Sequence, residues 1–215
     1  MFIDDKTLKQ KLANVYFIWG RGKTTIANRL RELYGCHVYS TDDSRLPHMR
    51  AASPEFQPYM CRDFVKEYGV KDFWELPPEV IAEREAHFVA EMTPMIIADL
   101  IALAPQHKVI LCEGDIDYAA VIPLASHAVH LQNRGTGFDW FDRPDHSGSL
   151  DAVKNRGDIS QAERDAIIVN AYAAVSGNEG VLPDWVVKFG VKNIAWGDHT
   201  GIDETAREVA EYFGF

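Results

Sequence analysis

The sequence is poor in cysteine and in long hydrophobic runs. Its three cysteines, Cys36, Cys61 and Cys112, are widely spaced without a CxxC pair, and their odd number argues against a disulfide framework. Two of them lie in or beside apolar segments, where we expect buried free thiols. No run of about 18 apolar residues is present, and residues 1–11 lack the apolar core of a signal peptide. These absences favour a cytoplasmic protein.

Positive charge is also scarce. Lys and Arg number 22 against 32 Asp and Glu, which gives a net charge of -10. Such a chain repels nucleic acid and anionic membranes at long range, so we expect neither as a partner, although a local basic pocket for one phosphate group is compatible with it. The eight histidines show no HxxxH or HxH spacing, so the sequence predicts no His-based metal site.

The hydrophobic pattern predicts an α/β fold. Hydrophobic residues make up 47% of the chain and charged residues 25%, as in folded globular proteins. Short β-rich runs alternate with longer segments of helical periodicity, as expected of βαβ units around a parallel sheet. The predicted strands cover residues 14–19, 37–41, 108–114, 127–132 and 192–196. We expect one domain spanning residues 1–215.

Helical periodicity is clearest in the segments that separate or follow these strands. The predicted helices cover residues 24–34, 79–103, 160–175 and 202–213. Pro94 predicts a kink in the longest of them, and Ser160 with Glu163 forms a capping box at the start of the third. Residues 200–203 open the last helix. The side chains that we expect to face the core from that helix are Ile202, Ala206, Val209 and Phe213.

Two segments lack a regular pattern. Residues 44–78 contain five prolines among aromatic residues, which predicts an irregular insertion with short helices. Residues 133–158 are rich in Gly and Asp and have the composition of a mobile flap. This flap carries Arg134, Arg143 and Arg156.

The most specific motif is the stretch Gly20-Arg21-Gly22-Lys23-Thr24-Thr25. In a phosphate-binding loop, glycines turn backbone N–H groups toward the phosphates, the lysine neutralises their charge and the Ser/Thr hydroxyl binds Mg²⁺. The strict pattern G-x-x-x-x-G-K-[ST] is absent, because Phe17 occupies the place of its first glycine. The stretch nevertheless forms the first βα turn of a doubly wound sheet, where ligands bind. The alternative is an unrelated βα turn.

The chain resembles the P-loop small-molecule and nucleoside monophosphate kinase superfamily, especially its shikimate-kinase-like and chloramphenicol-phosphotransferase-like branches. The resemblance spans nearly the whole chain and is carried by YFIWGRGKTTIANRL, VYSTDD, VILCEG, the arginine-bearing flap and the last strand–helix pair. The chain differs in having a shorter phosphate-binding loop. The resemblance implies a three-layer fold with strand order 2-3-1-4-5, ATP and Mg²⁺ as cofactors, and a monomer or homodimer that phosphorylates a small molecule.

The resemblance also implies roles for individual residues. Lys23, Asp42 and Arg143 are the predicted catalytic residues. The predicted cofactor contacts are Gly20, Arg21, Gly22, Lys23, Thr24, Thr25 and Arg156. The predicted substrate contacts are Asp42, Asp43, Arg50, Glu113 and Gly114, and the predicted Mg²⁺ ligands are Thr24 and Asp42. Residues with weaker claims are His48, Arg62, Arg84, His87, Asp115, Asp117 and Arg164.

The acidic candidates also have a physical rationale of their own. Asp42 and Asp43 are adjacent carboxylates at the end of a predicted strand, a position from which one can orient an acceptor hydroxyl and take its proton. The alternative is a helix cap or a turn. Glu113 closes an apolar strand, where it is placed either to meet Mg²⁺ or substrate or to point to solvent.

Two functions are therefore compatible with the sequence. The first is ATP-dependent phosphoryl transfer to a small-molecule hydroxyl or phosphate acceptor. The second is a catalytically impaired P-loop module that binds nucleotide or has a structural role, which the short loop favours because fewer backbone amides face the phosphates.

Overall fold

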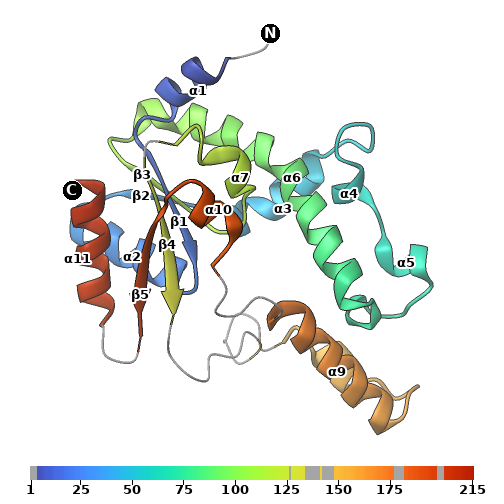
Figure 1. The fold of residues 1–215 in the computed structure, drawn as a ribbon. Coiled ribbons are helices and arrows are strands. Elements are labelled where there is room, and N and C mark those ends of the chain that lie inside the picture. Colours follow the sequence, from blue (N-terminus) through green and yellow to red (C-terminus); the bar gives the residue numbers. More distant parts are fainter. Residues whose placement is uncertain (1–3, 126, 134–140, 142–147, 177–181, 198–200) are drawn as a thin grey trace. The chain divides into compact units, whose positions relative to one another are not determined.

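The structure is a computed structural model that describes residues 4–125, 127–133, 141, 148–176, 182–197 and 201–215. Its strands form one parallel sheet (Figure 1). The strands are β1 (Val15–Gly20), β2 (His37–Ser40), β3 (Ile110–Glu113), β4 (His127–Asn133) and β5 (Lys192–Trp196). Their order in space is β2-β3-β1-β4-β5. The predicted doubly wound sheet with order 2-3-1-4-5 is confirmed.

The central strand β1 buries side chains on both of its faces, as a parallel sheet covered by helices requires. Ile18 and Phe17 are both fully buried and point to opposite faces because side chains alternate along a strand. Ile18 belongs to a core cluster that includes Ile26 and Phe213. The carboxyl ends of β1, β2 and β3 meet at one edge of the sheet, which brings the predicted motifs together.

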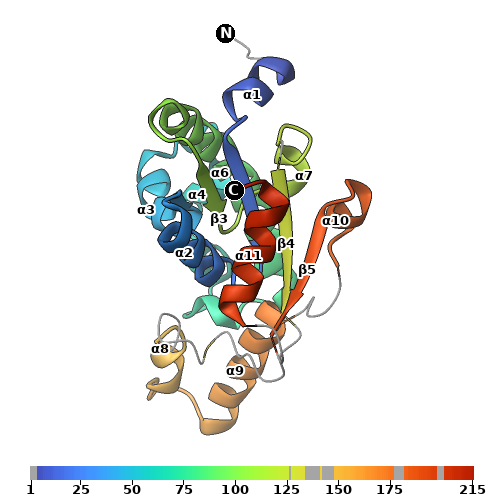
Figure 2. The ribbon, with the colours of Figure 1, turned by 90° about the vertical axis from the view of Figure 1, so that its left-hand side faces the viewer.

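Two long helices cover one face of the sheet. α2 (Lys23–Tyr34) and α11 (Ile202–Phe213) lie side by side on it, as Figure 2 shows. Ala206, Val209 and Phe213 of α11 are buried, as predicted. The prediction for Ile202 is wrong, since this side chain is 44% exposed. Ile202 is the first residue of the helix, and side chains of a helix tilt toward its N-terminus, so Ile202 points past the packed stripe.

The remaining helices connect or flank these elements. Their bounds are α1 (Asp5–Lys11), α3 (Thr41–Ala51), α4 (Pro58–Cys61), α5 (Phe64–Tyr68), η1 (Phe73–Glu75), α6 (Pro78–Leu103), η2 (Ala104–Gln106), α7 (Tyr118–Val121), α8 (Asp151–Lys154), α9 (Gln161–Ser176) and α10 (Asp184–Lys188). The predicted insertion does contain short helices, but its first residues belong to α3, which runs through Pro47. The capping box at the start of α9 is confirmed by reciprocal hydrogen bonds between Ser160 and Glu163.

Helix α6 is long and apolar. Together with η2 it is long and apolar enough to cross a membrane. Its most apolar 18 residues have a mean hydropathy of 1.6, and 28% of them are buried. One such helix is weak evidence for a membrane, because the core helix of a soluble protein can be as long and as apolar. Phe88, Ile96 and Leu100 of α6 are fully buried in the structure. These residues follow helical spacing, which is typical of a core helix.

The chain divides into two compact units. The first consists of Met1–Ala52, Val89–Gly135 and Leu182–Phe215 and holds the sheet. The second consists of Ser53–Phe88 and Thr136–Val181, which is most of the predicted insertion and flap together with α9. Each unit has hydrophobic clusters of its own. The expectation of a single domain stays a prediction.

The three cysteines are free. Cys36 and Cys112 are buried, as predicted for the two thiols in apolar segments, and Cys61 is exposed. Burial raises the pKa of both buried thiols, because an apolar surrounding disfavours the thiolate. We therefore assign them a packing role.

Candidate functional site

The turn between β1 and α2 consists of only Arg21 and Gly22. Gly20 and Gly22 have φ values of 104° and 82°, a region that side chains with a Cβ rarely adopt. A Cβ at Gly20 would lie 2.0 Å from the carbonyl oxygen of Leu131, and one at Gly22 would lie 1.9 Å from the Trp196 ring. Packing within the fold therefore demands glycine at both positions.

Trp196, at the end of β5, packs on this turn. Its indole Nε1 donates a hydrogen bond to the carbonyl of Arg21 at 2.7 Å. The backbone N–H of Arg21 in turn donates to the carbonyl of Leu131 at 3.2 Å. Both peptide groups of Arg21 are therefore used within the fold. The amides of Gly22, Lys23, Thr24 and Thr25 remain as donors for a phosphate group, because the first intrahelical hydrogen bond of α2 runs from the N–H of Ile26 to the carbonyl of Gly22.

The N-terminus of α2 is suited to an anion. Gly22 is its N-cap residue, and no side chain caps the helix or adds a negative charge in its first turn. The first N–H groups of a helix have no partner within the helix and carry the positive end of the helix dipole. Lys23, the first residue of α2, adds a cationic side chain at the same place.

A hydroxyl–carboxylate pair lies beside this helix start. The Thr24 Oγ1 donates to Oε2 of Glu113 at 2.8 Å. Glu113 is fully buried, and its Oε1 has no hydrogen-bond partner among the described residues. A buried carboxylate oxygen without a partner is costly, so this oxygen marks a place where a ligand or cation would be stabilising.

Several groups act on the Glu113 carboxyl. Burial is the largest effect and raises its pKa, because desolvation disfavours the charged form. The pKa is lowered by the hydrogen bond from Thr24, by the positive charge of Lys23 and by the Ser40 hydroxyl. The negative charge of Asp42 raises it. Ser40 is paired with Glu113 in the β2–β3 register. The sheet edge therefore brings together the residues that the sequence placed after three different strands.

Asp42 and Asp43 lie in the first turn of α3 and are exposed. Their charges suit the positive end of that helix, so the helix-start alternative has support as well. The charge of Asp42 also acts on the Glu113 carboxyl. The sequence paired Asp42 with Thr24 as a metal ligand, whereas the structure places Glu113 on the Thr24 hydroxyl.

Gly114 permits a close approach, as the sequence suggested, but the approaching group is the Thr41 side chain. With φ at 116°, a Cβ on Gly114 would lie 2.1 Å from the Thr41 Oγ1. This hydroxyl is buried and has no hydrogen-bond partner in the described part of the chain. Sequence reasoning did not select Thr41, Ser40 or Trp196, because only the strand pairing and the close packing give them their positions.

The predicted arginines belong to different parts of the chain. Arg143 and Arg134 lie outside the described residues. Arg156 belongs to the second unit, where it pairs with Glu75 and Asp158. Thr25 and Arg50 are exposed residues of α2 and α3. Roles in nucleotide or substrate binding for these residues stay predictions.

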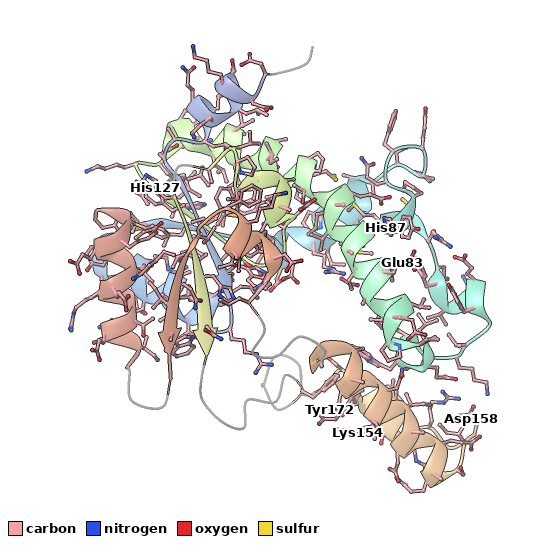
Figure 3. All side chains as sticks on the ribbon, viewed as in Figure 1. Glu83, His87, His127, Lys154, Asp158 and Tyr172 are labelled. Atoms are coloured by element: carbon pink, nitrogen blue, oxygen red, sulfur yellow. The ribbon has the colours of Figure 1, made fainter. Side chains whose placement is uncertain are left out.

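Other weaker candidates have structural partners. The buried His48 contacts Asp99 at 2.9 Å. His87 stacks on Tyr59 with ring centroids 4.1 Å apart, and it follows Glu83 by one turn on α6 (Figure 3). His48 is thus held by its contact with Asp99, and the exposed His87 by stacking on Tyr59; neither contact requires a substrate.

Most of the remaining weaker candidates form ion pairs or hydrogen bonds within their own unit. Arg62 pairs with Glu67, and Arg84 pairs with Glu85. The backbone carbonyls of Arg156 and Ile159 accept hydrogen bonds from Arg164. Asp117 caps α7 by accepting from the N–H of Ala120. Asp115, which follows Gly114, is exposed.

The donor set at Thr24 and Glu113 fits Mg²⁺. A hydroxyl and a carboxylate are hard oxygen donors, and Mg²⁺ is usually held by one or two carboxylates together with waters and phosphates. The Thr24 hydroxyl directs its proton to Glu113, which leaves its lone pairs for a cation. Within the described ranges, no cluster of three or more His, Cys, Asp and Glu side chains forms a metal cage.

Comparison with known proteins found solved structures that are similar to this chain. No protein family description and no curated protein matches the chain. A dephospho-CoA kinase from Campylobacter jejuni is similar in structure with 12% identity, a TM-score of 0.46, and coverage of 94% of this chain and 98% of its own. A NadR protein in complex with NR is similar with 12% identity, a TM-score of 0.40, and coverage of 98% of this chain and 52% of its own.

Proposed function

We propose that this chain transfers a phosphoryl group from ATP to a hydroxyl or phosphate group of a small molecule. The observation that carries the proposal is the Thr24–Glu113 pair. It joins a hydroxyl at the start of an uncapped helix to a fully buried carboxylate with a free oxygen. Purely structural requirements do not explain a buried carboxylate whose second oxygen has no partner in the described chain.

The nucleotide would bind at the start of α2. The amides of Gly22, Lys23 and Thr24 would meet its phosphates, and the Lys23 ammonium would neutralise their charge. The Arg21 side chain is partly buried, which lowers its pKa without removing its charge. We propose that Arg21 adds positive charge where the short loop has few amides.

Thr24 and Glu113 would hold Mg²⁺, which supplies positive charge against the phosphate oxygens when it is bound. Asp42 would act on the acceptor. It accepts the proton that an acceptor hydroxyl loses as its oxygen bonds to the γ-phosphorus and ADP departs. Its exposed position at the start of α3 keeps it accessible to a substrate.

A catalytically impaired nucleotide-binding or structural module is the second candidate. One observation favours it, namely that Trp196 fills the space against Gly22 and uses the carbonyl of Arg21. The finer assignments, to the shikimate-kinase-like or chloramphenicol-phosphotransferase-like branch and to the cytoplasm, are proposals that rest on the sequence.

Titration calorimetry with ATP and Mg²⁺ tests the proposal. We expect the wild type to bind and Lys23→Ala to bind about 10- to 100-fold more weakly, because a hydrogen bond to a charged group contributes about 1.5–3 kcal/mol. Lys9→Ala is the matched control, since Lys9 is an exposed lysine of α1 in the same unit, and its affinity should not change.

Two outcomes would decide against phosphoryl transfer. Absence of binding by the wild type would contradict any nucleotide-using function. Binding without release of ADP in the presence of hydroxylated metabolites, antibiotics and nucleotides would favour the non-catalytic module.

A further inference from the structure

An open pocket of about 360 Å³ lies in the second unit, against α9 and η1. Its volume falls within the range of small-molecule sites, about 300–1,000 Å³. The lining residues are Trp74, Glu75, Ile159, Glu163, Ala166, Ile167 and Asn170. None of these residues belongs to the site at the sheet edge. Figure 3 locates α9 by Tyr172 on the helix and by Asp158 just before it.

The walls of the pocket are tied together by hydrogen bonds. The Asn170 Nδ2 donates to the carbonyls of Trp74 and Leu76 at 2.7 and 2.6 Å, which joins α9 to η1. The Trp74 Nε1 donates to the carbonyl of Ser149 at 3.2 Å, and this bond fixes the indole. A ligand would therefore enter a pocket that is already formed and would not bear the cost of ordering it.

The polar groups that face the pocket are hydrogen-bond acceptors. Oε2 of Glu163 accepts from the N–H and the hydroxyl of Ser160, both at 2.7 Å. These hydrogen bonds lower the pKa of Glu163 and keep it ionised at neutral pH. Oε1 of Glu75 accepts a hydrogen bond from the Arg156 guanidinium. Among the contacts of the described residues, the other oxygen of each carboxylate and the Oδ1 of Asn170 remain for a ligand.

The charged side chains that line the pocket are both carboxylates, Glu75 and Glu163. Cations lie beyond the lining, where Arg156 pairs with Glu75 and the Arg164 guanidinium donates to the backbone carbonyl of Ile159. No Lys, Arg or His is among the lining residues. An anionic ligand would meet repulsion and no donor, whereas a cation would meet acceptors on an aromatic and aliphatic floor.

We propose that this pocket binds an organic cation, a primary ammonium or guanidinium group carried on a compact apolar body. The N–H groups of the ligand would donate hydrogen bonds to oxygens of Glu163, Glu75 and Asn170. Its apolar body would lie against Trp74 and Ile167. This site is separate from the proposed phosphoryl transfer and does not depend on it.

Calorimetry with three probes of similar size tests the charge preference. The probes are 2-phenylethylammonium, the neutral 2-phenylethanol and the anionic phenylacetate. We expect saturable binding of the ammonium with a Kd of about 1 mM, as suits so small a ligand, and much weaker binding of the other two. Raising the salt concentration should weaken the ammonium binding, because screening reduces the attraction of partly exposed charges.

Variants locate the site. Glu163→Gln should weaken ammonium binding about five- to tenfold, because it removes a charged acceptor, while glutamine preserves the capping box and the fold. Glu79→Gln, an exposed position of α6 in the same unit, is the matched control and should have no effect. Lys23→Ala should also leave ammonium binding unchanged, so this proposal and the proposed function fail separately.

Three results would overturn the inference. They are absence of saturable ammonium binding to the wild type, equal affinity for the alcohol and the ammonium, and equal effects of Glu163→Gln and Glu79→Gln. Thermal unfolding of each variant verifies that a loss of binding does not come from unfolding.

Discussion

Replacing Glu113 by glutamine should stabilise the protein at neutral and alkaline pH. Glu113 is fully buried, and burial is the main reason that its pKa is raised. Glutamine has nearly the same shape and still accepts the hydrogen bond from the Thr24 hydroxyl, but it carries no charge. The variant therefore avoids the cost of burying a charge, while the amide nitrogen that replaces Oε1 stays a buried polar group without a partner among the described residues.

The size and the pH dependence of the effect follow from the same carboxyl. Only the part of the cost that comes from the charge is removed, because the amide that replaces Oε1 is still polar and buried; we expect a gain of about 1 kcal/mol, which corresponds to a rise of roughly 2–4 °C in Tm for a chain of this length. Because the folded pKa lies above the unfolded pKa, the folded state holds more protons between the two values, and stability falls as pH rises through that window. Glu113→Gln removes this slope, so its advantage over the wild type should grow from acid to alkaline pH.

Thermal unfolding followed by circular dichroism at several pH values measures this effect. Glu211→Gln, an exposed position of α11 in the same unit, is the control for the loss of one carboxylate. A second series with ATP and Mg²⁺ should stabilise the wild type and the control but not Glu113→Gln, since the variant lacks the proposed metal ligand. A variant that is less stable than the wild type at alkaline pH without ligand would refute the argument from burial.

Two further substitutions test the turn and the acceptor site. Gly22→Ala should destabilise the protein by about 2–4 kcal/mol in urea denaturation, because its positive φ is strained for alanine and the new Cβ would collide with Trp196; an unchanged midpoint would contradict this packing. Asp42→Asn should lower turnover by about 10²–10⁴-fold, as expected for loss of a catalytic base, while the calorimetric affinity for ATP with Mg²⁺ stays nearly constant. Equal losses of turnover and affinity would argue against the role assigned to Asp42.

Much of the fold can be predicted from the sequence, because local patterns and tertiary packing favour the same strands and helices. The strand predicted at residues 192–196 is β5 itself, and the helix predicted to stop at Tyr34 ends there because Gly35 adopts the left-handed conformation. Periodicity is less informative at the ends of helices. Ile202 fits the apolar stripe of its helix by spacing, yet its place in the first turn leaves it exposed.

The candidate site was predicted only in part. Lys23 and Thr24 are found by a local motif that needs no partner from elsewhere in the chain. The sequence left Glu113 open between a site residue and a solvent-facing strand end, and the structure places it against Thr24 with no exposed surface. Strand order decides this contact, because β3 lies next to β1 in the sheet although it comes long after it in the chain.

The sequence by itself determined the alternation of strands and helices, the position of the phosphate-loop motif and the acidic character of the chain, since each depends on residue type and short-range spacing. Only the tertiary structure decided that Trp196 packs on Gly22 and that Thr24 bonds to Glu113. It also decided that Asn170 ties α9 to η1 beside an acceptor-lined pocket. These contacts join residues far apart in the chain, and their geometry depends on how the strands and helices pack.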